Sequence, residues 1–286
     1  MKKKKGSLKK LAAMPAVASV FALAASAANA STPVFNYTFP ASWGGTGTTI
    51  TDQSSAGNNG FSDGTLSLSS TVPPGAGAGT ESLVTSSGGI LTSATSLLNN
   101  STVAADGGFS FNCDFMWNGT DSSSFGHTQK LIDYAGTESL QLVTTSGSAA
   151  LQMQFGNDTG AESVIGTTIL PNTWYNVSLD FNTEGGSLGL TGDISGIAAL
   201  YVNGSLAAWE NMTKGTYGDG LNRPIGVGQL GANFGYLVGF KGDIYSASVN
   251  LGAAPVPEPS TLALSLIGGI GVMGMMWKGR RRNAGS

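Results

Sequence analysis

Cysteine and histidine are almost absent from this chain of 286 residues, which contains only Cys113 and His127. A single cysteine cannot form an internal disulfide, so the fold must depend on its hydrophobic core. One histidine and one cysteine also exclude a zinc site of His and Cys ligands within one chain. Cys113 falls in an alternating apolar run, Phe109 to Trp117, which predicts a buried, inert thiol. His127 is expected in a loop without a catalytic role, because no Gly-x-Ser-x-Gly string frames a nucleophilic serine, and a Ser-His-Asp arrangement with Asp121 or Asp133 is the alternative.

Positive charge is nearly missing from the middle of the chain. Ten of the 14 basic residues lie within residues 1–10 and 278–282, which leaves four between residues 31 and 255. Against these four stand 16 acidic residues, so this segment carries a net charge of about −12. Nucleic acids and anionic membrane surfaces both require a basic patch, and the sequence therefore argues against them as partners.

The catalytic strings of common hydrolases are also missing. Sandwich-fold glycoside hydrolases place paired carboxylates on one strand, in strings such as Glu-x-Asp-x-x-Glu, and no such string occurs. We therefore predict no catalytic residues and a protein that is not an enzyme. Gly226-Val227-Gly228-Gln229-Leu230-Gly231 matches a dinucleotide-binding fingerprint, but no βαβ pattern surrounds it, and a glycine-rich strand and turn explains it.

The C-terminus combines three features in a fixed order. Val256-Pro257-Glu258-Pro259-Ser260 is held extended by its prolines, and residues 261–277 carry no charge. As a helix, that uncharged stretch would span about 26 Å, near the short limit for a bilayer core. Lys278 and the cluster Arg280, Arg281 and Arg282 follow, and such a basic end marks the cytoplasmic side of a membrane. We expect a linker at 253–260, a transmembrane helix at 261–277 and a basic cytoplasmic tail at 278–286.

This order resembles the PEP-CTERM sorting signal of Gram-negative bacteria that produce exopolysaccharide. The resemblance implies that a membrane-embedded transpeptidase, exosortase, recognises the motif and processes the protein for delivery to the cell surface or extracellular matrix. An ordinary tail anchor with a proline-rich stalk is the alternative.

The N-terminus agrees with export. Residues 1–10 hold six lysines, an apolar run covers Leu11 to Ala25, and Ala28-Asn29-Ala30 supplies a small-x-small cleavage pattern. We predict a signal peptide at 1–30, cut between Ala30 and Ser31, and therefore the Sec translocon and signal peptidase as partners. A first transmembrane helix is the alternative, but the run is short for one.

Period-2 alternation dominates between these signals, and no convincing helical period occurs. The clearest predicted strands are 109–117, 140–143, 151–155, 174–181, 200–202, 205–209 and 244–251. Asn203-Gly204 suits a two-residue hairpin turn between two of them. The Ser/Gly-rich region from Thr65 to Asn100 is expected to form irregular strands and loops. Many short strands with turns between them predict one all-β domain at 31–252, an antiparallel sandwich.

Five strings in order resemble laminin-G-like domains of the concanavalin A-like lectin and glucanase class. They are Thr51 to Gly60 with Gly64-Thr65-Leu66, Gly108 to Phe111 with Trp117, Trp174 to Leu179, Leu200 to Gly204, and Ile225-Gly226 with Phe240 to Ile244. The resemblance implies a two-sheet jelly-roll sandwich that binds carbohydrate or protein. The last string departs from the family, because Tyr245 and Ser246 stand where an acidic pair is more usual.

Candidate binding residues are aromatic, since sugar rings stack on exposed aromatic faces. Trp43, Trp209, Tyr217 and Tyr236 lie in loop-like contexts, whereas Trp117 and Trp174 are expected on core strands. Asp52 and Asp243 are candidates for a structural Ca²⁺ site, and two solvated turn acids are the alternative. No other metal or cofactor is predicted.

These observations predict an exported, surface-destined, non-enzymatic protein whose sandwich binds extracellular polysaccharide or a surface partner. A structural matrix component without a discrete ligand is the first alternative, and an exported glycoside hydrolase is the second.

Overall fold

The computed structural model describes residues 31–40, 49–93, 95, 97–98, 100–121, 127–134, 138–145, 147–155, 162–183, 196–212, 224–229 and 239–252. Nearly all of the regular structure in them is β, and the strands named below pair antiparallel throughout. The elements are β1 (Thr32–Pro40), β2 (Thr49–Ile50), β3 (Gly60–Ser69), β4 (Thr80–Thr92), α1 (Asn100–Asp106), β5 (Gly108–Trp117), β6 (Thr128–Tyr134), β7 (Glu138–Thr145), β8 (Ser148–Phe155), β9 (Glu162–Ile169), β10 (Trp174–Asn182), β11 (Gly196–Val202), β12 (Ser205–Met212), β13 (Ile225–Val227) and β14 (Gly242–Leu251).

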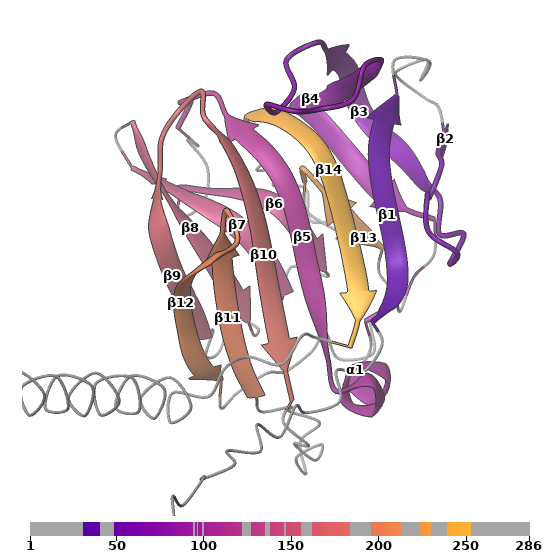
Figure 1. Ribbon diagram of the computed structural model, residues 1–286, viewed down its shortest axis with the longest axis vertical. Coiled ribbons are helices and arrows are strands. Elements are labelled where there is room, and N and C mark those ends of the chain that lie inside the picture. The colour runs from indigo at the N-terminus through magenta and orange to yellow at the C-terminus, as the bar shows by residue number, and fades with distance from the viewer. Residues whose placement is uncertain are drawn as a thin grey trace, which may run out of the picture.

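The strands form two layers that face each other (Figure 1). The front layer has the order β12-β11-β10-β5-β14-β1, and the rear layer has the order β4-β13-β6-β7-β8-β9. Strand β4 links the layers: Thr80 and Glu81 pair with β1, whereas Ile90 and Leu91 pair with β13. Strands β2 and β3 continue the rear layer beyond β4. The predicted β-sandwich is thereby confirmed, while the jelly-roll connectivity stays a prediction.

Alternation along the strands fills the space between the layers. Phe109, Phe111, Cys113, Phe115 and Trp117 all point inward from β5 and are almost completely buried. The rings of Phe109, Phe155 and Phe181, from three different strands, lie with centroids 4.8 to 6.0 Å apart. Such tilted aromatic contacts add to the burial of apolar area, which is the main stabilising contribution to a fold without disulfides.

The region from Thr65 to Asn100 is more regular than the sequence predicts. It contains the second half of β3 and all 13 residues of β4, and α1 begins at its end. Two of its glycines meet a packing requirement: a Cβ at Gly88 would collide with the backbone of Asp63, and one at Gly89 would collide with the backbone of Val227. Glycine here marks close backbone approach within a sheet rather than a loop.

The hairpin between β11 and β12 forms as predicted. Asn203 and Gly204 both have positive φ, 50° and 74°, as the two central residues of a type I′ turn require. Asn203 also ties the turn to the neighbouring strand, because its Oδ1 accepts a hydrogen bond from the backbone N of Asn176 at 3.0 Å. The turn therefore holds the outer end of β10 in register with β11.

Candidate functional site

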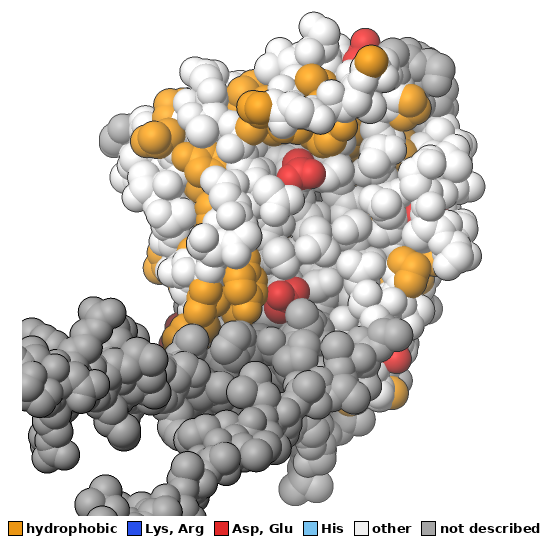
Figure 2. All heavy atoms as spheres, in the orientation of Figure 1, with side chains coloured by type: hydrophobic (Ala, Val, Ile, Leu, Met, Phe, Trp, Pro, Cys, Tyr) orange, Lys and Arg blue, Asp and Glu red, His pale blue; other side chains and the backbone are white. Residues whose placement is uncertain are grey.

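The outer face of the front layer is lined with polar side chains. They alternate with the core residues of β5, β10 and β14, so each points away from the rear layer. We call this surface the polar face, and its residues are Ser110, Asn112, Asp114, Asn176, Ser178, Asp180, Ser246, Ser248 and Asn250. Figure 2 views the molecule from this side: the face is hollowed toward its centre, acidic side chains occur within it, and hydrophobic atoms flank it.

Asp114 forms the centre of a row of side chains that crosses three strands. Its Oδ1 accepts a hydrogen bond from Asn176 Nδ2 at 2.6 Å, and its Oδ2 accepts one from Ser246 Oγ at 2.6 Å. These partners are its direct neighbours in the register of β10 and β14. A carboxylate offers about four acceptor sites, so this one is held in orientation and retains capacity for hydroxyl donors of a ligand.

A second row lies further along the same strands. Asp180 is only 8% exposed and accepts a hydrogen bond from Ser178 Oγ at 3.2 Å. Burial raises the pKa of Asp180 to about 6, although the bond from Ser178 opposes the shift. Burial and the nearby Asp180 charge together raise the pKa of Tyr201. Ser110 and Asn250 complete this row, and Ser110 Oγ accepts hydrogen bonds from Asn250 at 3.3 Å and from Asn112 of the next row at 3.5 Å.

Aromatic side chains stand at the borders of the polar face. Trp209 lies on the edge strand β12, is 40% exposed, and shares a row with Ala199 and Asp180. Two strand spacings, about 9.6 Å, separate Trp209 from Asp180, and the small Ala199 stands between them. At the other end, Trp174 and Tyr245 meet edge to face with centroids 6.4 Å apart.

Of the four aromatic residues that the sequence suggests for binding, only one lies among the described residues. Trp209 is exposed beside the polar face, while Trp43, Tyr217 and Tyr236 lie outside the described residues. Of the two tryptophans expected on core strands, Trp117 is fully buried. Trp174 pairs with Met116 on the outer side of the sheet, so only its strand, and not its side chain, belongs to the core.

Asp52 and Asp243 are not brought together. The Asp52 carboxylate is engaged in its own loop, where it accepts bonds from the backbone N of Asn36, Ser54 and Asn58. Asn36 pairs with Ser248, five residues along β14 from Asp243, which corresponds to roughly 16 Å. Among the residues that the structure describes, no three His, Cys, Asp or Glu side chains are grouped to hold a metal ion.

Asp243 is instead a neighbour of Asp114. It lies opposite Met116, which is two residues from Asp114 on β5, so Asp243 and Asp114 are diagonal neighbours across the two strands, with a bulge at Tyr245 between the two pairs. Burial raises the pKa of Asp243. The sequence does not reveal this pair, because the two residues are 129 positions apart and become neighbours only through the pairing of β5 with β14.

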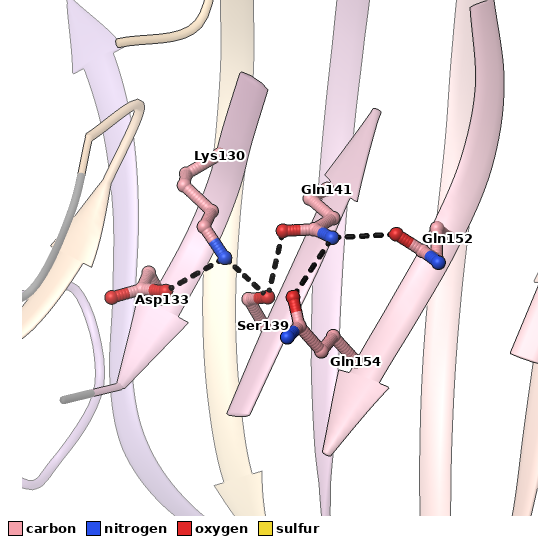
Figure 3. A network of polar contacts seen from close by, with 6 residues as sticks. All are labelled: Lys130, Asp133, Ser139, Gln141, Gln152 and Gln154. Atoms are coloured by element: carbon pink, nitrogen blue, oxygen red, sulfur yellow. Dashed lines mark hydrogen bonds and ion pairs between the residues drawn. The ribbon is translucent and has the colours of Figure 1, made fainter. Parts of the chain in front are cut away.

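The outer face of the rear layer carries a different polar cluster, drawn in Figure 3. Lys130 Nζ lies 3.3 Å from Asp133 Oδ1 and donates to Ser139 Oγ at 2.8 Å, and Ser139 donates to Gln141 Oε1 at 3.1 Å. Gln141 Nε2 in turn donates to Gln152 and Gln154, at 2.6 and 3.1 Å. These contacts join the six side chains across three strands, which reduces the cost of burying their polar groups.

Comparison with protein families identifies the C-terminus. Residues 255–282 match the family model of the PEP-CTERM protein-sorting motif. The PEP-CTERM motif predicted from Val256-Pro257-Glu258-Pro259-Ser260 is thereby confirmed. It implies export, processing by exosortase, and sorting to the surface of a Gram-negative cell. Within the described part of the chain no helix is long and apolar enough to cross a membrane, and the segment expected to do so, 261–277, lies outside that part.

The sandwich resembles domains of solved structures in its fold. Domain 4 of AbnA, a GH43 extracellular arabinanase from Geobacillus stearothermophilus solved with arabinotriose, aligns with a TM-score of 0.50 and 15% identity over 81% of this chain and 96% of that one. The binding domain of botulinum neurotoxin DC, solved with SialylT, gives 0.48 and 12% over 82% of this chain and 51% of that one. This chain therefore spans about half of the neurotoxin chain. No curated protein matches the sequence. At these identities the likeness concerns the fold.

Proposed function

We propose that this exported, surface-sorted protein binds a polysaccharide through the polar face and does so without catalysis. The observation that carries the proposal is the row Asn176, Asp114 and Ser246, in which an outward carboxylate is fixed by two short hydrogen bonds. Sugar sites pair such fixed acceptors with aromatic rings, and Trp209 supplies an exposed ring on the same face. The arabinanase domain solved with arabinotriose adds support only through its similar fold.

Both terminal signals fit this role. We propose that residues 1–30 direct the chain to the Sec translocon, and that signal peptidase cuts between Ala30 and Ser31. Residues 261–277 would then hold the protein in the inner membrane, with Arg280 to Arg282 on the cytoplasmic side, until exosortase acts at the motif. The sandwich would thus be delivered to the place where extracellular polysaccharide accumulates.

The test compares Asp114→Asn with the matched control Asp63→Asn, which changes an exposed carboxylate on β3. Both variants and the parent are purified as full-length protein in a neutral detergent and screened on a glycan array, with titration calorimetry of the hits. A hydrogen bond to a charged group contributes about 1.5–3 kcal/mol, so Asp114→Asn should weaken binding by about 10- to 150-fold. Asp63→Asn should bind like the parent.

Failure of the parent to bind any glycan at about 1 mM would favour a structural matrix component without a discrete ligand. A hydrolase is the other candidate, and one observation favours it. Asp114 and Asp243 point outward from adjacent strands as diagonal neighbours, and inverting glycosidases likewise use two carboxyl groups that face one site, about 6.5–9.5 Å apart. New reducing ends released from a bound glycan by the parent, but not by Asp243→Asn, would establish hydrolysis instead of binding alone.

A further inference from the structure

The charges on the front layer all have one sign. Its six strands contain no Lys or Arg, whereas Asp114, Asp180 and Asp243 all point outward from it. The two cations within the described residues lie elsewhere. Lys130 is on β6 of the rear layer, where it faces Asp133. Lys241 precedes β14, two residues before Asp243, and Figure 2 shows no Lys or Arg side chain on the described part of this face. Lys214 and Arg223 lie outside the described residues.

The remaining side chains of the polar face are neutral amides and hydroxyls. Each can donate to and accept from a sugar hydroxyl, but none can neutralise a carboxylate or sulfate. A uronic acid, sialic acid or sulfated sugar on this face would therefore place its anion among three carboxylates without a counter-charge. Anion recognition in proteins relies on Arg, Lys, helix N-termini or a bound metal ion, and the described front strands supply none of them.

The carboxylates are also poorly arranged for a cationic ligand. Asp180 is nearly buried and Asp243 is half-buried, so a cationic ligand would have to lose much of its hydration to pair with either of them. An ammonium group is strongly hydrated, and pairing it with a largely buried carboxylate costs that hydration, whereas fixed acceptors in a polar row suit hydroxyl groups.

We propose that the ligand of the polar face is an uncharged oligosaccharide, recognised through its hydroxyl groups, and that the face discriminates against uronic, sialylated and sulfated glycans. This inference rests on the proposed binding function and specifies its substrate class.

The experiment uses glycan probes that differ in charge on a shared backbone. Cellotetraose, its C6-oxidised tetra-uronate and fully deacetylated chitotetraose form one series, and galactotetraose with tetragalacturonate forms another. Arabinotriose, mannotetraose, an alginate tetramer and a chondroitin sulfate tetramer extend the neutral and anionic sets. Full-length protein in neutral detergent is titrated with each at low salt, where charge effects are largest.

The best neutral glycan should bind at least about tenfold more tightly than any anionic glycan. An anionic or cationic probe that binds as tightly as the best neutral one would overturn the inference while leaving glycan binding intact. Binding of no probe from any set would instead contradict the proposed function itself.

A second experiment adds a positive charge to the polar face through Ser248→Lys, with Ser248→Gln as its matched control. Ser248 lies on β14 opposite Asn112, at a half-buried position of the polar face. A lysine there should improve binding of the uronate partner of the preferred glycan by at least about threefold relative to glutamine. The gain should disappear at about 1 M salt. Equal uronate binding by the two variants would place the ligand elsewhere and refute the assignment.

Discussion

Replacement of Asp52 by alanine should destabilise the sandwich far more than its position in a surface loop suggests. The side chain is only 7% exposed, and its carboxylate accepts four hydrogen bonds. Three come from the backbone N atoms of Asn36 and Ser54 at 2.8 Å and of Asn58 at 2.9 Å, and one comes from Ser54 Oγ at 2.8 Å. The bond from Asn36 ties the loop that follows β2 to strand β1. Asp52→Ala therefore leaves three backbone donors without their acceptor.

The magnitude follows from those donors. Each backbone N–H that loses its partner costs about 1–1.5 kcal/mol, so the variant should lose about 3–4 kcal/mol of unfolding free energy. For a domain of this size, 1 kcal/mol corresponds to about 2–4 °C, which predicts a fall in Tm of about 10 °C. Thermal unfolding of the full-length protein, followed by tryptophan fluorescence, measures this shift. Asp63→Ala, which removes an exposed carboxylate from β3, should change Tm by no more than about 2 °C.

The effect should depend on pH in a defined direction. Burial alone would raise the pKa of Asp52, but its hydrogen bonds outweigh burial and lower it. A carboxyl group with a lowered pKa stabilises the fold above its unfolded pKa of about 3.9, and that contribution is lost as the pH falls through the folded value. The gap between parent and Asp52→Ala should therefore narrow below about pH 4. Equal Tm values for the two alanine variants would refute the reasoning. A Tm of the parent that rises with millimolar Ca²⁺, while that of Asp52→Ala does not, would show that the carboxylate holds a metal ion instead.

Three further predictions concern other parts of the chain. Asp180→Asn should stabilise the protein by up to about 3 kcal/mol near pH 7.5 and by little near pH 4. With a folded pKa of about 6, the Asp180 carboxyl group destabilises the fold only as the pH rises from about 4 to 6 and the group must ionise while buried. Equal stabilisation at both pH values in thermal unfolding would contradict this. Gly204→Ala should cost about 1–2 kcal/mol, since alanine is strained at its φ of 74°, and Gly147→Ala in the turn between β7 and β8, at a φ of 81°, should cost a similar amount. A neutral result in urea unfolding would argue against strain. Replacement of Pro257-Glu258-Pro259 by three alanines should leave membrane insertion intact but keep the full-length form in the inner membrane of an exosortase-positive host. Immunoblots of membrane and surface fractions measure this. Normal surface delivery of the variant would show that the motif is only a spacer.

The front layer was predictable because its signal is local. Alternation over Phe109 to Trp117 and over Trp174 to Phe181 predicts one buried and one solvated side, and the structure confirms both. The Asn203-Gly204 turn was equally clear, since few dipeptides tolerate two successive residues at positive φ. In each case a few residues that are neighbours in the sequence determine the local structure.

The rear layer shows where local reasoning fails. Gly88 and Gly89 look like a loop signal, yet they allow β4 to approach the backbones of β3 and β13, and that requirement exists only once distant strands have paired. The same limit applies to the candidate site. Asp114, Asn176 and Ser246 are ordinary polar residues in the sequence, and only the register of three strands makes them one row.

That row also argues against a face that is merely solvated. Serine and asparagine side chains on an open sheet surface remain free to rotate, and fixing them costs conformational entropy that hydration does not require. Here two of them lie 2.6 Å from the same carboxylate, one on each oxygen, and Asn176 is itself tied to Asn203 through its backbone. A binding site whose polar groups are ordered before the ligand arrives does not bear that ordering cost during association. Disruption of the row by Ser246→Ala should therefore weaken glycan binding more than it changes Tm, because its main effect is the loss of orientation at Asp114.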